Sequence, residues 1–263
     1  MNVRGSNSTQ RAAKNVVITG ASSGIGAAIA EVLTSRGDRV LLVARRADAL
    51  DDVARRCGTS AATVSADMTI RSDVARVVRH AIDAFGHIDV WINNVGRGIT
   101  RMPSKLTDDD IDDMITVNVK SALYGMQEIL PHFQERRTGQ VINISSMLGR
   151  IPSAIHRSSY SASKHFLNAL TINMRMEVQQ EYPHIEFSLV SPGVVRTDFG
   201  LNAVHGGVDS RVLPNSQSAE EVADVVAWVV DERIPDAYTR VGAHDEVVGY
   251  YATIGVERTP RDS

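Results

Sequence analysis

The sequence predicts an α/β fold with a doubly wound parallel sheet of about seven strands, helices on both faces and a single domain. Short runs rich in β-branched residues alternate with longer amphipathic stretches along most of the chain. Several of these runs are apolar on both faces, which is typical of central strands in a parallel sheet covered on each side. The length, 263 residues, suits one α/β domain whose core needs neither disulfides nor a structural metal.

The predicted elements alternate regularly between strand and helix. Strands are predicted at 15–19, 39–44, 62–66, 89–93, 140–145 and 186–190, and helices at 24–37, 47–56, 71–85, 107–137, 160–182 and 218–231. Ser218 and Glu221 have the spacing of a capping box at the start of the last helix. Right-handed crossovers would place the ligand site at the carboxyl ends of the strands.

Two segments depart from this alternation. Residues 199–217 form a long connection that contains Gly206-Gly207, so we expect a mobile flap there. The last part of the chain offers only a weak strand candidate, at 238–241. Polar composition at both ends predicts a disordered lead-in at 1–14, one folded domain at 15–255 and a polar tail at 256–263.

The composition argues against several classes of partner. The 28 Lys and Arg residues nearly balance the 31 Asp and Glu residues, so the net charge is −3 and no basic stripe for nucleic acid or for a membrane surface stands out. The longest apolar run, 225–230, is far shorter than the roughly 20 residues of a bilayer span. With no signal-peptide pattern, we expect a cytoplasmic protein. The single cysteine, Cys57, is expected to pack in a helix, and no metal site is predicted.

A glycine-rich turn follows the first predicted strand directly. Gly20, Gly24 and Gly26 would let the backbone turn sharply and approach a pyrophosphate, while free N–H groups at the helix start point toward the anion. A tight turn without a ligand is the alternative, and the context of strand, glycines and helix argues against it. The other predicted contacts in this turn are Ser22, Ser23 and Ile25.

The turn reads Thr-Gly-Ala-Ser-Ser-Gly-Ile-Gly from residue 19, with glycine spacing G-x3-G-x-G. In this and in later motifs the chain resembles the classical short-chain dehydrogenase/reductase (SDR) family, from about residue 15 to residue 231. The resemblance implies a Rossmann-type fold and an oxidoreductase of carbonyl or alcohol substrates that uses a nicotinamide dinucleotide.

The end of the second strand bears on the choice of dinucleotide. The strand end has no carboxylate that could hydrogen-bond the free ribose 2′-hydroxyl of NAD(H). Arg45 and Arg46 follow it instead. Because a guanidinium binds phosphate through two parallel hydrogen bonds, we predict NADP(H), with Arg45 as the main contact and Arg46 second. NAD(H) stays open, since both arginines could be solvated at a helix start and Ser23 stands where NADP-preferring relatives often have a basic residue.

The resemblance implies further cofactor contacts on other strand ends. Asp67 would bind the adenine amino group with its carboxylate, and Met68 would contribute its backbone. A helix cap is the alternative for Asp67. Asn94 would brace the sheet centre and line the cofactor. After the sixth strand, the family's PG-x3-T element corresponds to Pro192, Gly193, Val195 and Thr197, which would meet the nicotinamide carboxamide and the pyrophosphate.

The reaction needs a proton donor or acceptor at the substrate oxygen. Tyr160 and Lys164 are spaced i and i+4 at a helix start, so the phenol and the ammonium can share one cleft. A nearby ammonium would lower the tyrosine pKa from about 10 toward working pH and make Tyr160 a usable general acid or base. Such a pair alone is common in helices, and its position in the family pattern is what favours catalysis. His165 is assigned to packing or surface.

Two more catalytic candidates come from the resemblance. Ser146, at the end of the fifth strand, would hydrogen-bond the carbonyl oxygen, with its neighbour Ser145 as the alternative. The loop 147–159 is one residue longer than is commonest in the family. Asn118 would hold a water that links the lysine to solvent, and an asparagine at mid-helix indicates a local break in the predicted helix 107–137; an exposed polar residue is the alternative.

These observations predict an NADP(H)-dependent oxidoreductase that interconverts a ketone or aldehyde and an alcohol, with Tyr160 as general acid or base. A non-catalytic NAD(P)-binding redox sensor is the alternative class. The partner would be a small carbonyl or alcohol substrate bound among 97–101, 147–157 and the flap, and its identity is open. By resemblance to the family, a homodimer or homotetramer paired through the helices at 107–137 and 160–182 is expected.

Overall fold

The computed structural model describes residues 11–255. The predicted tail at 256–263 and most of the predicted lead-in therefore lie outside the described residues. Within them the chain forms one seven-stranded sheet, in the order β3-β2-β1-β4-β5-β6-β7, in which every neighbouring pair is parallel. The predicted doubly wound single domain is confirmed, and the order changes direction between β1 and β4, as a ligand-binding crevice in such a sheet requires.

The strands are β1 (Asn15–Thr19), β2 (Arg39–Ala44), β3 (Ala61–Ser65), β4 (Val90–Asn93), β5 (Gly139–Ile144), β6 (Ile185–Ser191) and β7 (Asp236–Tyr238). The helices are α1 (Gly24–Ser35), α2 (Ala47–Cys57), α3 (Arg71–Phe85), α4 (Asp108–Ile115), α5 (Ser121–Arg136), α6 (Ser158–Val178), α7 (Ala219–Glu232) and α8 (Ala243–Ala252). The predicted strands and helices shift by only a few residues at their ends. The capping box of Ser218 and Glu221 forms as predicted at the start of α7.

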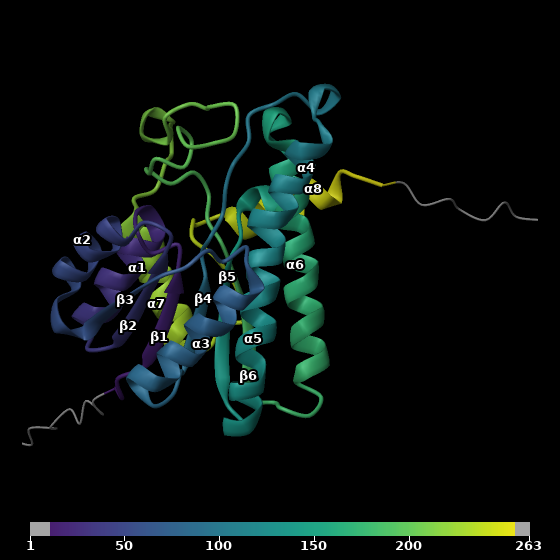
Figure 1. The fold of residues 1–263 in the computed structure, drawn as a ribbon. Helices are drawn as coiled ribbons and strands as arrows, with labels where there is room; N and C mark the ends of the chain where they lie inside the picture. Colours follow the sequence, from purple (N-terminus) through teal and green to yellow (C-terminus); the bar gives the residue numbers. More distant parts are fainter. Residues whose placement is uncertain (1–10, 256–263) are drawn as a thin grey trace, which may run out of the picture.

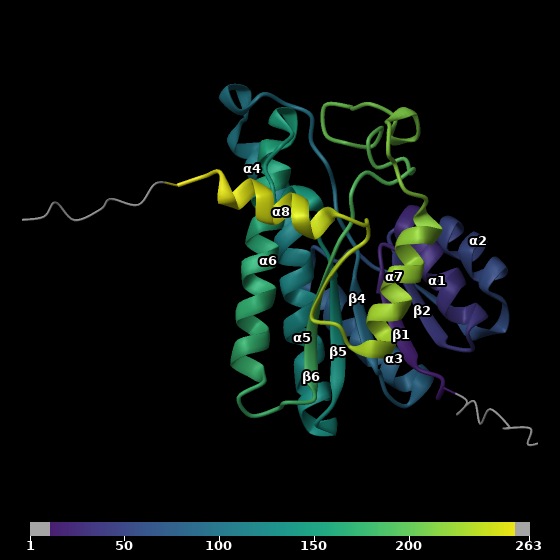
Figure 2. The same ribbon diagram turned by 180° about the vertical axis from the view of Figure 1, so that it is seen from behind.

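Two layers of helices bury the sheet between them (Figures 1 and 2). One core contains α1, α2 and α7, through side chains such as Ile29, Leu50 and Val226. The other contains α3, α5 and α6, with Trp91 of β4 and Phe133 of α5 fully buried at its centre. The faces of the central strands alternate between these two cores, which is why β1 and β2 are apolar at nearly every position.

The predicted helix 107–137 is interrupted where Asn118 led us to expect a break. Residues Thr116–Lys120 form a π-helical turn between α4 and α5. Such turns are rare and often occur at functional sites. Asn118 lies in it, fully buried, so the alternative of an exposed polar residue is wrong.

The C-terminal part contains more structure than the sequence predicted. The weak strand candidate at 238–241 is displaced by a few residues and forms the short edge strand β7. Helix α8 was missed, and it crosses near the ends of α4 and α6 in both views (Figures 1 and 2). No helix in the described range 11–255 combines the length and the apolarity of a bilayer span.

A buried polar network crosses the centre of the sheet. Asn93 of β4 donates through Nδ2 to Asn143 Oδ1 of β5 at 2.8 Å, and Trp91 Nε1 donates to Asn93 Oδ1 at 2.7 Å. Asn143 Nδ2 in turn donates to Thr171 Oγ1 of α6 at 2.8 Å. These bonds satisfy amides that would otherwise be costly to bury, and they join two strands to the helix that carries Tyr160.

Candidate active site

The glycine-rich turn connects β1 to α1 and is held from the next strand. Asn94 donates through Nδ2 to the carbonyl oxygens of Thr19 and Gly20, at 3.2 and 3.1 Å. Gly20 has φ +67°, in the left-handed region. A Cβ on Gly26 would lie 2.4 Å from the Gly20 oxygen, so only glycine lets α1 approach the turn this closely.

The start of α1 leaves its amides available. Ser23 is the N-cap, but its side chain makes no capping hydrogen bond. The first turn, which contains Ile25, has no acidic residue. Backbone N–H groups at a helix start suit an anion such as a pyrophosphate. The turn therefore fits the phosphates of a dinucleotide through its backbone and its shape.

The two arginines after β2 are both exposed, and neither forms an ion pair with a carboxylate in the described residues 11–255. Arg46 reaches back over the turn, where its Nη2 lies 3.4 Å from Ser22 Oγ. The Arg45 carbonyl accepts from Ser65 Oγ at 3.0 Å, which fixes its backbone at the end of β3. The structure thus brings Arg46 to the glycine turn and leaves the Arg45 side chain toward solvent.

Asp67 and Met68 follow β3 on the same edge of the sheet. Asp67 Oδ1 accepts from both the backbone N and the Oγ1 of Thr69, at 2.9 and 2.7 Å, and Met68 is buried. The helix-cap alternative for Asp67 is wrong, because the N-cap of α3 is Ile70. The carboxylate instead forms a local turn.

The segment after β6 lies against the glycine turn. Thr197 Cγ2 would be 3.2 Å from a Cβ on Gly24, so these two residues touch across the site. Pro192 accepts through its carbonyl from Met147 N at 2.8 Å, Gly193 lies under the Arg240 side chain, and Val195 is buried. Of the four residues of the predicted element, Thr197 is therefore the one seen to border the glycine turn.

Tyr160 lies in the first turns of α6 with only 7% of its surface exposed. Ser146 lies beside it, and its hydroxyl acts to lower the pKa of the phenol. The neighbouring Ser145 points elsewhere, since its Oγ donates to Asn168 Oδ1 at 2.5 Å. Adjacent residues at a strand end face opposite sides, and here it is Ser146 that faces Tyr160.

Lys164 and Asn118 converge on Gly96, near the start of the loop after β4. A Cβ on Gly96 would lie 3.4 Å from Asn118 Oδ1 and 3.6 Å from Lys164 Nζ. Lys164 Nζ donates to the carbonyl oxygen of Ile144 at 2.9 Å. The Asn118 amide exchanges hydrogen bonds with the backbone of Arg97, at 2.8 Å from Arg97 N and 3.0 Å to Arg97 O. All four predicted catalytic residues therefore lie around one point at the carboxyl edge of the sheet.

The expected lowering of the Tyr160 pKa by Lys164 is wrong for this structure. Burial raises the pKa of Tyr160 to about 12, against smaller opposing effects of the Ser146 hydroxyl and the Arg157 charge. Burial also lowers the pKa of Lys164 to about 8. Removal from water outweighs the attraction that the i, i+4 spacing suggested, because it penalises the charged form of both groups.

These two shifts predict opposite effects of pH on stability. Between pH 8 and 10.5, Lys164 is protonated in the unfolded chain and neutral in the folded one, so stability rises with pH. Between pH 10 and 12, Tyr160 is ionised only in the unfolded chain, so stability falls. Urea unfolding across pH 7–12, compared with Lys164→Met and Tyr160→Phe, measures each contribution by difference. A Lys164→Met curve parallel to wild type below pH 10 would contradict the assignment.

The expected flap lies over this centre. Phe199 contacts Tyr160 edge-on, with ring centroids 5.5 Å apart. Val204 pairs with Ile99 in a parallel bridge, and His205 Nε2 lies 2.7 Å from Asp110 Oδ1 of α4. The three segments that the sequence assigned to the substrate pocket thus meet here. Within them, the Phe199 ring contacts Tyr160, and the charge of Arg157 acts on its phenol.

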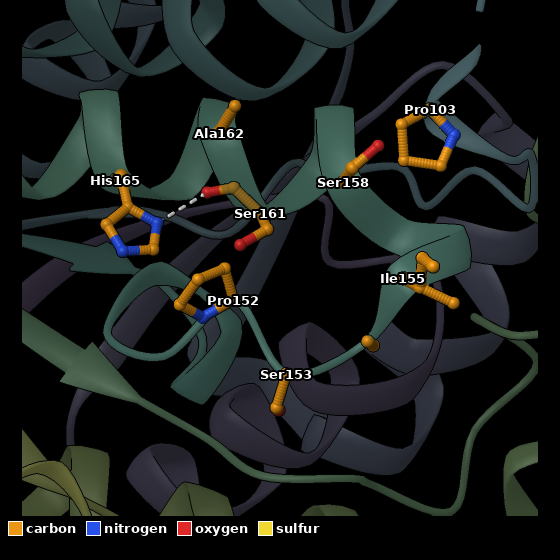
Figure 3. A pocket seen from close by; sticks show the side chains of 9 residues that line it. Pro103, Pro152, Ser153, Ile155, Ser158, Ser161, Ala162 and His165 are labelled. Atoms are coloured by element: carbon orange, nitrogen blue, oxygen red, sulfur yellow. Dashed lines mark hydrogen bonds between the residues drawn. The ribbon is translucent and has the colours of Figure 1, made fainter. Parts of the chain in front are cut away.

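A separate hollow of about 620 Å³ lies on the outer side of the start of α6 (Figure 3). Its lining includes Pro103, Pro152 and His165, and the carbonyl oxygen of Ser161 accepts from His165 Nδ1 at 2.9 Å. None of the four predicted catalytic residues lines it. His165 therefore faces away from Tyr160. In the described range 11–255, no group of His, Cys, Asp and Glu side chains is arranged to hold a metal ion.

Comparison with known proteins agrees with this geometry. The family model described as short chain dehydrogenase matches residues 14–205. An uncharacterized oxidoreductase of Staphylococcus epidermidis is 36% identical over 222 residues, which cover 83% of this chain and 91% of that protein. A short chain dehydrogenase/reductase from Burkholderia phymatum, in complex with NAD, has the same fold, with a TM-score of 0.85 at 23% identity over 95% of this chain and 97% of that one. An alcohol dehydrogenase from the archaeon Thermococcus sibiricus, complexed with 5-hydroxy-NADP, gives 0.75 at 25% identity over 86% and 96%.

Proposed function

Since this chain belongs to the short-chain dehydrogenase/reductase family of oxidoreductases, we propose that it interconverts a ketone or aldehyde and the corresponding alcohol with NADP(H). The observation that carries the proposal is the convergence of Tyr160, Ser146, Lys164 and Asn118 beside the glycine turn. A proton donor, a hydrogen bond for the substrate oxygen and a dinucleotide turn are the three requirements of this reaction, and one crevice contains residues suited to each.

The cofactor would be held mainly by backbone. The turn Gly20–Gly26 and the start of α1 suit the pyrophosphate, Asp67 and Met68 suit the adenine, and residues 192–197 suit the nicotinamide end. When bound, the dinucleotide supplies the hydride for reduction or accepts it in oxidation. Solved relatives hold NAD in one case and a hydroxylated NADP in another, so the family accommodates both.

The protein's own groups would manage the oxygen and its proton. Ser146 would donate a hydrogen bond to the carbonyl oxygen, where negative charge develops. Tyr160 would give its phenolic proton to that oxygen in reduction and take it back in oxidation. A pKa of about 12 keeps the phenol protonated at neutral pH, as proton donation in the reductive direction requires. Lys164 and an Asn118-held water would return the proton from solvent.

The preference for NADP(H) is tested at the two arginines. We expect Arg45→Asp and Arg46→Asp each to lower kcat/KM with NADPH about 10- to 100-fold, because each removes a cation suited to the 2′-phosphate and adds an anion that repels it. The rate with NADH should be unchanged or rise. Steady-state kinetics with both cofactors measures the ratio, and the structure adds that Arg46, next to Ser22, should have the larger effect. A wild-type protein that prefers NADH would contradict this part of the proposal.

A further inference from the structure

Arg157 stands at the start of α6, three residues before Tyr160. Its guanidinium is half-buried, and Nη1 is out of contact with solvent and has no hydrogen-bond partner among the described residues 11–255. Burial lowers its pKa, and Tyr160 is the one group whose charge acts on it in the opposite sense. A guanidinium nitrogen that is buried and left without a partner is costly to the folded protein.

The neighbouring arginines are all paired. Arg97 has Asp113 at 3.1 Å, Arg101 has Asp110 at 3.0 Å, and Arg150, in the same loop as Arg157, holds both oxygens of an aspartate at 2.6 and 2.7 Å. In the part of the chain that the structure describes, no carboxylate is placed within ion-pair distance of Arg157. Its counter-ion must therefore come from outside this chain's described residues if it has one.

The groups around Arg157 form a polar corner on the outer side of Tyr160. A Cβ on Gly207 would lie 3.0 Å from Arg157 Nη2 and 3.1 Å from Thr100 Oγ1, so the two side chains meet at one point. Thr100 Oγ1 is also buried without a hydrogen-bond partner in the described range. Arg157, three residues before Tyr160, and Thr100 beside it thus provide two donors without acceptors, which indicates that a negatively charged acceptor is missing.

Phe199 separates this corner from solvent. A Cβ on Gly98 would lie 2.5 Å from Arg157 Nη1 and 3.0 Å from the Phe199 ring, so the ring and the guanidinium lie side by side over Gly98. Phe199 is 36% exposed and stands at the start of the long flap. A ligand would reach the guanidinium by displacing this ring toward solvent.

We propose that Arg157, with Thr100, binds a carboxylate of the substrate, so that the enzyme acts on short oxo acids and hydroxy acids. The planar fork of a guanidinium matches the two oxygens of a carboxylate. Arg157 and Tyr160 lie about one helical turn apart, so a carboxylate on Arg157 would be close to a carbonyl at Tyr160, which suits a short oxo acid. This inference rests on the proposed function, and it assigns the substrate class that the sequence left open.

The test compares acids with their neutral esters. With NADPH, kcat/KM is measured for 2-oxobutanoate, 3-oxobutanoate and their methyl esters, in wild type and in Arg157→Met, Arg157→Lys and Thr100→Val. We expect Arg157→Met to lower the value for the preferred acid about 10- to 100-fold, mostly through KM, and the value for its ester less than about threefold. Arg157→Lys should recover part of the loss. The matched control is Arg55→Met, which removes the same charge from an exposed ion pair on α2.

A second readout does not depend on turnover. Oxamate carries a carboxylate but no ketone, and calorimetry measures its binding to the protein loaded with NADP⁺. We expect binding by wild type, and a loss of about 10-fold or more in Arg157→Met. Melting curves establish that each variant folds, and if Arg157→Met does not, Arg157→Lys and Thr100→Val carry the same comparison.

The experiments distinguish a failure of the carboxylate inference from a failure of the proposed function. Equal losses for acid and ester would mean that Arg157 acts on Tyr160 and would overturn the inference while the proposed function stands. A wild type that reduces esters but neither acid would overturn it in the same way. Oxamate binding that depends on Arg157, in a protein that reduces none of these carbonyls, would uphold the carboxylate site and count against the proposed function.

Discussion

Replacing Tyr160 with phenylalanine is expected to lower the rate of carbonyl reduction by about 10²-fold or more, because the variant lacks the only proton that the side chain can give to the substrate oxygen. The ring stays in place, since its contacts with Phe199 do not involve the hydroxyl. Binding of NADPH should therefore change little. The rate is followed by the loss of absorbance of the reduced nicotinamide, and binding by its fluorescence.

A matched control shows whether any loss of a tyrosine hydroxyl lowers the rate, or only the loss of the one at Tyr160. Tyr124 on α5 stacks under the Arg71 guanidinium at 4.4 Å, outside the site, and Tyr124→Phe should leave the rate unchanged. If Tyr160→Phe and wild type reduced carbonyls equally fast, Tyr160 would not be the general acid. If wild type bound NADPH but reduced no carbonyl, the alternative of a redox sensor would be favoured.

Replacing Gly26 with alanine is expected to destabilise the protein by about 1–3 kcal/mol and to weaken NADPH binding about tenfold or more. The added Cβ would stand 2.4 Å from the Gly20 oxygen and 2.6 Å from Asn94 Nδ2, so α1 or the turn must move. Movement of either would displace the backbone amides that are expected to bind the phosphates of the cofactor. Urea unfolding and fluorescence titration with NADPH measure the two effects.

A glycine-to-alanine substitution in helix α8 should instead raise the free energy of unfolding. Gly249 lies in the exposed helix α8, and a Cβ there would meet nothing within 4 Å. Gly249→Ala should therefore stabilise the protein by about 0.5–1 kcal/mol, through the lower conformational entropy of alanine in the unfolded chain, and leave NADPH binding unchanged. Unchanged stability and binding in Gly26→Ala would contradict the role assigned to the turn.

The sheet could be predicted because its signals are local. Apolar runs such as 39–44 identify central strands wherever they occur, and the π-helical turn was indicated by Asn118, which is poorly suited to a helix interior. Helix α8 could not be predicted in this way. It is a short helix with little apolar periodicity, it starts after Gly242 in the left-handed region, and its position depends on distant contacts such as that of Tyr251 with the Arg150 carbonyl.

The residues of the predicted catalytic centre were found by motif, whereas Phe199 and Arg157 were placed only within broad pocket segments. Arg157 stands three residues before Tyr160 in sequence, but Phe199 lies far along the chain, and only the fold brings its ring against Tyr160. The direction of the Tyr160 pKa was wrong for a related reason. Spacing along a helix places a charge near the phenol, whereas burial depends on every segment that covers it.

The amides at the centre of the sheet also affect how the chain folds. If β5 paired with β4 one residue out of step, Asn143 would turn to the opposite face, and its amide would lose its bonds with Asn93 and Thr171. Each unpaired buried group costs about 1–3 kcal/mol, so a misaligned sheet is penalised beyond its lost packing. An apolar strand pair would tolerate such a slip more readily. The network thus favours the correct strand alignment, and with it the docking of α6, which carries Tyr160 and Lys164.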